Sequence, residues 1–111
     1  MIVNFQEVDK KVEKILDVLF KLGFSYEIFS PKRINIIDNN VQFAEKRNIG
    51  VITQYNDGKV SVRIYGYKNR QKLKQAMRSN EIVFSKNASL TDVGVNTRKL
   101  VRKYIDSNKL L

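Results

Sequence analysis

The first hydrophobic pattern in the chain has the period of an α-helix. Apolar residues recur at three- and four-residue spacing between positions 8 and 20, while charged residues such as Lys11 fall mostly outside this stripe. The stripe consists of Val8, Val12, Ile15, Leu16, Leu19 and Phe20. Asn4 and Glu7 have the spacing of a capping pair, and Gly23 is suited to end the helix. The pattern therefore predicts an amphipathic helix over residues 5–22.

From Phe24 the hydrophobic period changes to two, which is typical of β-strands. The alternation covers residues 24–28 and is stopped by Pro31. Residues 33–37 and 41–45 flank Asp38-Asn39-Asn40, a run whose side chains bond their own backbone in turns. The sequence therefore predicts a strand followed by a hairpin.

The strongest turn signal is Asp57-Gly58, which separates residues 49–56 from residues 59–67. This pair favours a two-residue type I′ turn. Such a turn brings alternate residues of the two strands together on one face, which we expect to be core. The predicted pairs are Tyr55 with Val60, Thr53 with Val62 and Val51 with Ile64, and the opposite face then holds Ile52, Gln54, Ser61, Arg63 and Tyr65.

The C-terminal third predicts two helices separated by a strand. Residues 68–78 have a weak apolar stripe and predict a short surface helix, and residues 81–85 predict a buried strand. Ser89 and Asp92 have capping-box spacing for a last helix that ends near Asp106, with Asn96 as the alternative cap. The apolar stripe of this helix is Val93, Thr97, Leu100, Val101, Tyr104 and Ile105.

This order of elements predicts an α+β fold. We expect residues 1–111 to form a single two-layer domain, with an antiparallel sheet of about four to five strands, an N-terminal helix and two C-terminal helices.

The composition removes several classes of function. The chain has no cysteine and no histidine, which excludes thiolate metal sites, thiol nucleophiles and His-dependent catalytic sites. We expect no cofactor and no metal. No apolar run is long enough for a membrane span, and the first residues lack a signal-peptide pattern, so we expect a cytoplasmic protein.

The charge is concentrated in the second half of the chain. Residues 1–57 contain eight Lys/Arg and eight Asp/Glu, whereas residues 58–111 contain thirteen and three. The net charge of +10 therefore belongs to the second half. One-signed charge raises self-repulsion in a folded domain, so this asymmetry indicates a polyanionic partner or a solubilising role.

Basic and aromatic side chains interleave in the segment that follows Gly58, and further cations lie on the last helix. Clustered Lys and Arg release counterions from phosphates, and exposed tyrosines stack on unpaired bases. The predicted binding residues are Arg63, Tyr65, Tyr67, Lys68, Arg70, Lys74, Arg78, Arg98, Lys99, Arg102 and Lys103.

Three interpretations of this basic surface remain open. The first is a small non-catalytic nucleic-acid-associated accessory protein that binds DNA or RNA through phosphates. The second is an inhibitor or regulator from a phage or mobile element, which binds an acidic groove of a nucleic-acid-processing protein. The third is a plain solvated face. The helix at 68–78 is too weakly apolar for a membrane-surface role.

An enzymatic interpretation has little support. Asp38, Glu45 and Asp57 loosely resemble the acidic residues of metal-dependent nucleases. Asp38 and Asp57 are more simply turn formers, and Glu45 is a solvent-facing strand residue. We therefore expect the protein not to be an enzyme.

Overall fold

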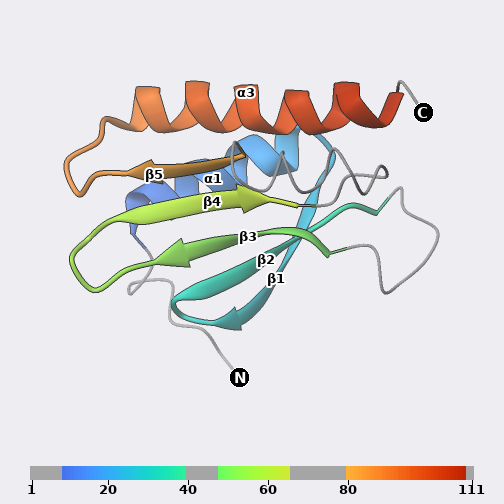
Figure 1. Cartoon of the computed structure of the whole chain (residues 1–111). Helices are drawn as coiled ribbons and strands as arrows, with labels where there is room; N and C mark the ends of the chain where they lie inside the picture. The colour runs from blue at the N-terminus through green and yellow to red at the C-terminus, as the bar shows by residue number, and fades with distance from the viewer. Residues whose placement is uncertain (1–8, 40–47, 66–79, 110–111) are drawn as a thin grey trace.

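The computed structural model describes residues 9–39, 48–65 and 80–109. These residues form two helices and five strands (Figure 1). In chain order the elements are α1 (Lys10–Lys21), β1 (Ser25–Ser30), β2 (Arg33–Ile37), β3 (Asn48–Gln54), β4 (Val60–Ile64), β5 (Glu81–Phe84) and α3 (Leu90–Lys109).

The five strands form one antiparallel sheet in the order β1-β2-β3-β4-β5. Side chains of α1, α3 and one face of the sheet form a single hydrophobic cluster, so both helices cover the same face. In Figure 1, α1 lies behind the sheet and α3 runs along its upper border. The predicted α+β class with an antiparallel sheet is confirmed. The predicted helix at 68–78 lies outside the described residues.

Helix α1 begins five residues later than predicted. Asp9 has non-helical dihedral angles, and its carboxylate accepts a hydrogen bond from the backbone N–H of Lys11. Asp9 is therefore the N-cap, and the continuous helix predicted from residue 5 is wrong. The predicted capping pair, Asn4 and Glu7, lies outside the described residues.

The buried side of α1 also differs from the predicted stripe. Phe20 is 77% exposed, whereas Val18 is buried. Lys11, expected to face solvent, is 5% exposed because its ammonium group bonds the Asp9 carboxylate and the backbone carbonyl of Lys86, each at 2.9 Å. Hydrogen-bond partners thus allow a charged side chain to occupy a buried position.

The β3–β4 hairpin has a register that differs by one residue from the prediction. Gln54 pairs with Val60, and Tyr55 N–H donates to the carbonyl of Lys59, so three residues form the loop. Gly58, the last residue of this loop, has a φ of +90°. A three-residue hairpin loop also places a left-handed residue at this position, so the positive φ does not require a type I′ turn. The predicted type I′ turn is therefore wrong.

This register change exchanges the two faces of β3. Ile52 pairs with Val62 and is buried, whereas Val51 and Thr53, predicted in the core, point to the other face and are half-buried. Because side chains alternate along a strand, a shift of one residue reverses every side chain of that strand. The prediction for β4 is confirmed: its core face consists of Val60, Val62 and Ile64.

The predicted hairpin between residues 33–37 and 41–45 is also wrong. Strand β2 matches residues 33–37, but its two neighbours in the sheet are β1 and β3. No position beside β2 remains for a strand at 41–45, which lies outside the described residues.

Helix α3 runs parallel to α1 and packs beside it. Lys14 of α1 lies over Gly94, and Phe24, just after α1, contacts the ring of Tyr104 edge-on at 5.9 Å. The Ser89 hydroxyl accepts a hydrogen bond from Asp92 N–H, which confirms the predicted N-terminal cap. The predicted apolar stripe of this helix is confirmed, with Ile105 half-buried and the other five residues buried.

Candidate functional site

The structure describes six of the eleven predicted binding residues. These six are Arg63, Tyr65, Arg98, Lys99, Arg102 and Lys103. The other five, Tyr67, Lys68, Arg70, Lys74 and Arg78, lie outside the described residues.

Arg63 projects from the sheet face that lies away from α1 and α3, which we call the distal face. Its strand neighbours Val62 and Ile64 point into the core, so alternation directs Arg63 to the other side. Its guanidinium group forms a 3.0 Å ion pair with Glu81 of the adjacent strand. This cross-strand pair offsets the positive charge of Arg63 on the distal face.

Tyr65 follows β4 and is half-buried. Its hydroxyl donates a 2.9 Å hydrogen bond to the side-chain oxygen of Asn48. Burial raises the pKa of the Tyr65 phenol, and the nearby guanidinium groups of Arg33 and Arg63 oppose that shift only in part. Tyr65 is therefore a neutral, hydrogen-bonded side chain within the sheet, which limits how much of its ring a base can reach.

The strongest concentration of exposed cations among the described residues is on α3. We call it the α3 basic face, and it consists of Arg98, Lys99, Arg102 and Lys103, all exposed. The four residues form two pairs at i,i+4 spacing, which sets the members of each pair about 6 Å apart along the axis. Within the described part of the chain, no carboxylate forms an ion pair with Arg98, Lys99 or Arg102.

The buried side of α3 holds the basic face in place. Val93, Thr97, Val101 and Tyr104 are each at most 2% exposed and pack into the shared core. A helix anchored along its length presents its outer side chains at fixed spacing, so the α3 basic face is a preorganised surface. Like charges at i,i+4 spacing repel by a few tenths of a kcal/mol per pair, and a bound anion removes that repulsion.

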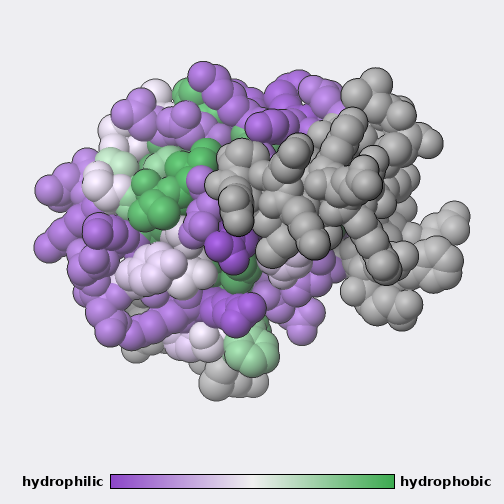
Figure 2. Space-filling view, viewed as in Figure 1, coloured by the Kyte–Doolittle hydropathy of each residue, from purple (hydrophilic) through white to green (hydrophobic). Residues whose placement is uncertain are grey.

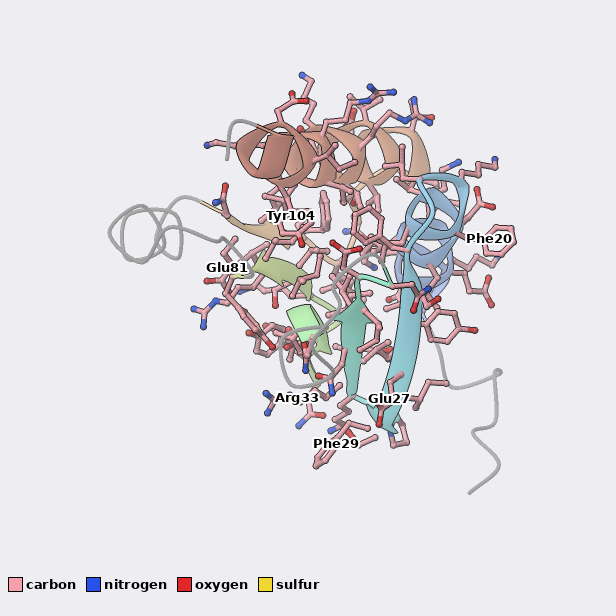
Figure 3. All side chains as sticks on the ribbon, turned by 90° about the vertical axis from the view of Figure 1, so that its right-hand side faces the viewer. Phe20, Glu27, Phe29, Arg33, Glu81 and Tyr104 are labelled. Atoms are coloured by element: carbon pink, nitrogen blue, oxygen red, sulfur yellow. The ribbon has the colours of Figure 1, made fainter. Side chains whose placement is uncertain are left out.

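The structure separates the predicted residues into two surfaces. Arg63 and Tyr65 belong to the side of the sheet away from the helices, whereas the α3 basic face belongs to the helix layer. In Figure 3, Glu81 and Arg33 lie on the side of the sheet away from α1, and α3 forms the top of the molecule. Figure 2 shows mostly hydrophilic side chains along the upper edge of the molecule, where α3 lies in Figure 1.

Within the described ranges, the exposed aromatic side chains lie on other elements than α3, which periodicity alone does not predict. Phe20 is on α1, Tyr26 and Phe29 are on β1, and Tyr55 directly follows β3. Figure 3 shows Phe20 and Phe29 far apart, with Phe20 beside α1 and Phe29 at the end of the sheet farthest from α3. Phe20 was missed because it continues the helical spacing of the apolar stripe. Phe29 lies at an irregularity of the β1–β2 register, between Ile28 and Ser30.

The acidic residues considered for catalysis do not come together in the described structure. Asp38 is buried and accepts a 2.6 Å hydrogen bond from the Tyr104 hydroxyl. Asp57 is exposed in the hairpin loop, where it accepts a hydrogen bond from Lys59 N–H, and Glu45 is not among the described residues. No group of three acidic side chains suited to a metal ion occurs in the described ranges. The interpretation of Asp57 as a turn former is confirmed, whereas Asp38 has a tertiary role.

Comparisons with protein-family models, curated proteins and solved structures found no match to this chain. Within residues 9–39, 48–65 and 80–109, neither helix combines the length and apolar character needed to cross a membrane.

Proposed function

We propose that this protein is a small non-catalytic accessory protein that binds nucleic acid through phosphate contacts made by the α3 basic face. The observation that carries the proposal is the placement of four exposed cations in two pairs on one anchored helix. Lys and Arg that neutralise phosphates release condensed counterions, which supplies most of the free energy of sequence-independent binding.

The charge distribution supports the same conclusion. Of the two acidic residues described in α3, Asp92 lies well before the stretch from Arg98 to Lys103 and Asp106 lies one turn after Arg102, so four cations face one neighbouring acid. The contribution of Arg63 is reduced by its pairing with Glu81. The cations at 68–78 remain a sequence-based prediction of additional phosphate contacts.

The test is a fluorescence-anisotropy titration of the full chain against labelled oligonucleotides at several salt concentrations. The double variant Arg98→Gln/Arg102→Gln removes two cations from the α3 basic face. Its matched control is Lys32→Gln/Lys59→Gln, which removes two exposed cations from the β1–β2 turn and the β3–β4 connection. Melting temperatures of both variants verify folding.

We expect the α3 variant to bind more weakly and to reduce the slope of log affinity against log salt by about 1.8 for duplex DNA, because each phosphate contact contributes about 0.9. The control should retain most of the affinity. Equal affinities for the two variants would refute the role of α3. Absence of binding even at low salt would overturn the proposal and leave an acidic protein as the expected partner.

A further inference from the structure

The shape and position of α3 indicate which form of nucleic acid it fits. The helix has 20 residues and is therefore about 30 Å long. It forms the upper border of the molecule in Figure 1 and the top of the molecule in Figure 3. Its outer side is thus convex and accessible along its length, unlike the surface of a groove.

An apolar residue lies on the midline of this outer side, near the N-terminal end of the helix. Val95 is 43% exposed, while Tyr104, nine residues later, is buried. Nine residues correspond to about two and a half helical turns, so Val95 and Tyr104 lie on opposite sides of the helix. Val95 therefore lies on the midline of the exposed surface, before the four cations.

The four cations follow Val95 along the helix, about 4.5–12 Å further along its axis. At about 100° per residue, Lys99 and Arg102 lie within about 40° of Val95 around the helix axis. Arg98 and Lys103 lie about 60–80° from Val95, on opposite sides of it. Around the helix axis, the outer side of α3 thus has Val95, Lys99 and Arg102 along its midline and one cation along each flank. The exposed Asp92 and Asp106 lie on the same side, before and after the four cations.

Resting on the proposed function, we infer that α3 binds duplex DNA by entering the major groove. The groove is about 12 Å wide, and a helix with its side chains is about 10–12 Å across. Arg98 and Lys103 would contact the phosphates of the two strands that border the groove. The midline would face the base edges, where Arg and Lys recognise guanine O6 and N7, and where an apolar side chain contacts the thymine methyl group.

The same residues disfavour the alternative polynucleotides. Single strands are bound by exposed aromatic rings beside cations, but the one aromatic residue of α3, Tyr104, is 2% exposed. Duplex RNA has a deep, narrow major groove that side chains cannot read. A convex basic helix without an exposed aromatic ring matches the major groove of DNA.

The experiment compares three ligands of the same sequence: duplex DNA, single-stranded DNA and duplex RNA. Anisotropy titration of the full chain should give at least about tenfold tighter binding to duplex DNA. Methylation by dimethyl sulfate at guanine N7, a major-groove atom, should decrease at saturating protein. A minor-groove ligand should not displace the protein.

Two variants introduce the same negative charge on different surfaces. Val95→Glu introduces an acid on the midline of the outer side of α3, whereas Val83→Glu changes a 54% exposed valine of β5 on the distal face. Val95→Glu should weaken duplex binding by about tenfold, and Val83→Glu should leave it nearly unchanged. Arg98→Gln/Lys103→Gln provides a second test on the flanks if Val95→Glu does not fold.

The outcomes separate this inference from the proposed function. Equal or tighter binding of single-stranded DNA or duplex RNA, or unchanged N7 methylation, would overturn the groove-binding inference and leave phosphate binding intact. A similar loss in Val95→Glu and Val83→Glu would also overturn it. Absence of binding to all three ligands would overturn both.

Discussion

The hydroxyl of Tyr104 on α3 donates a 2.6 Å hydrogen bond to Asp38, which follows β2 and lies 66 residues earlier in the chain. Both residues are buried, at 2% and 6% exposure. The Tyr104 ring also packs edge-on against Phe24, which precedes β1. One side chain thus connects α3 with two segments of the sheet and fixes the helix that carries the basic face.

Replacing Tyr104 with phenylalanine should lower the free energy of unfolding by about 1–3 kcal/mol. The ring and its contact with Phe24 remain, but the buried Asp38 carboxyl loses a donor. Urea denaturation measures the change. Tyr26→Phe, at a 40% exposed position, is the control and should change stability by less than about 0.5 kcal/mol. Equal effects would contradict the importance of the hydrogen bond.

The same glycine-to-alanine change should have opposite effects at two positions. At Gly94 an added Cβ would lie 2.8 Å from Cε of Lys14, the flexible end of a side chain that is able to move. Alanine also has the higher helix propensity, so Gly94→Ala should stabilise the protein by up to about 1 kcal/mol. The midpoint of urea denaturation should therefore rise.

At Gly50 the added Cβ would overlap the backbone carbonyl oxygen of Arg63 and lie 3.2 Å from the Cα of Ile64. Backbone atoms of a central strand cannot move without disturbing the sheet, so Gly50→Ala should destabilise the protein by about 1–3 kcal/mol. An unchanged denaturation midpoint for Gly50→Ala would show that β3 and β4 approach less closely than described.

Thr97→Val should increase stability by about 1 kcal/mol. Thr97 is fully buried, and its hydroxyl has no hydrogen-bond partner among the described residues. Valine has nearly the same shape and carries no polar group that needs a partner. Thermal unfolding measures the change, and the exposed Thr91→Val serves as the control. A loss of stability in Thr97→Val would indicate that the hydroxyl has a partner.

Asp9→Asn should make stability less dependent on acid pH. Burial acts to raise the pKa of the Asp9 carboxyl, but hydrogen bonds from the Lys11 side chain and backbone outweigh it, so the pKa is lowered from 3.8. A lowered native-state pKa contributes stability above the unfolded-state pKa, and this contribution disappears as the pH falls through the native-state value.

Asparagine is also a good N-cap, so this substitution removes mainly the charge. The wild type should be more stable than Asp9→Asn at pH 7, and the difference should shrink below about pH 4 in urea denaturation. Asp17→Asn, which breaks an exposed i,i+4 pair with Lys21, should have a small effect at either pH. A difference for Asp9→Asn that persists at pH 2 would contradict the assignment.

The sequence by itself determined the class of the fold and most of the helix and strand segments. Local periodicity was sufficient to predict the apolar stripe of α3 and the buried face of β4, because each depends only on the spacing of side chains along one element. Strand β2 and the Ser89 cap were predicted for the same reason. The concentration of charge in the second half of the chain is likewise a property of the sequence alone.

Only the tertiary structure decided the register of the β3–β4 hairpin, the partners of β2 and the burial of Lys11. The partners of β2 and the burial of Lys11 depend on atoms distant in sequence, such as the carbonyl of Lys86 that accepts a hydrogen bond from the Lys11 ammonium group. The hairpin register follows from a hydrogen bond between Tyr55 N–H and the carbonyl of Lys59, which closes a three-residue loop that side-chain alternation alone does not distinguish from a two-residue loop. The predicted binding residues lie on two separate surfaces, which periodicity does not predict. It assigns Arg63 and Arg98 to a face of their own strand or helix, but the side of the molecule on which that face lies depends on how the elements pack.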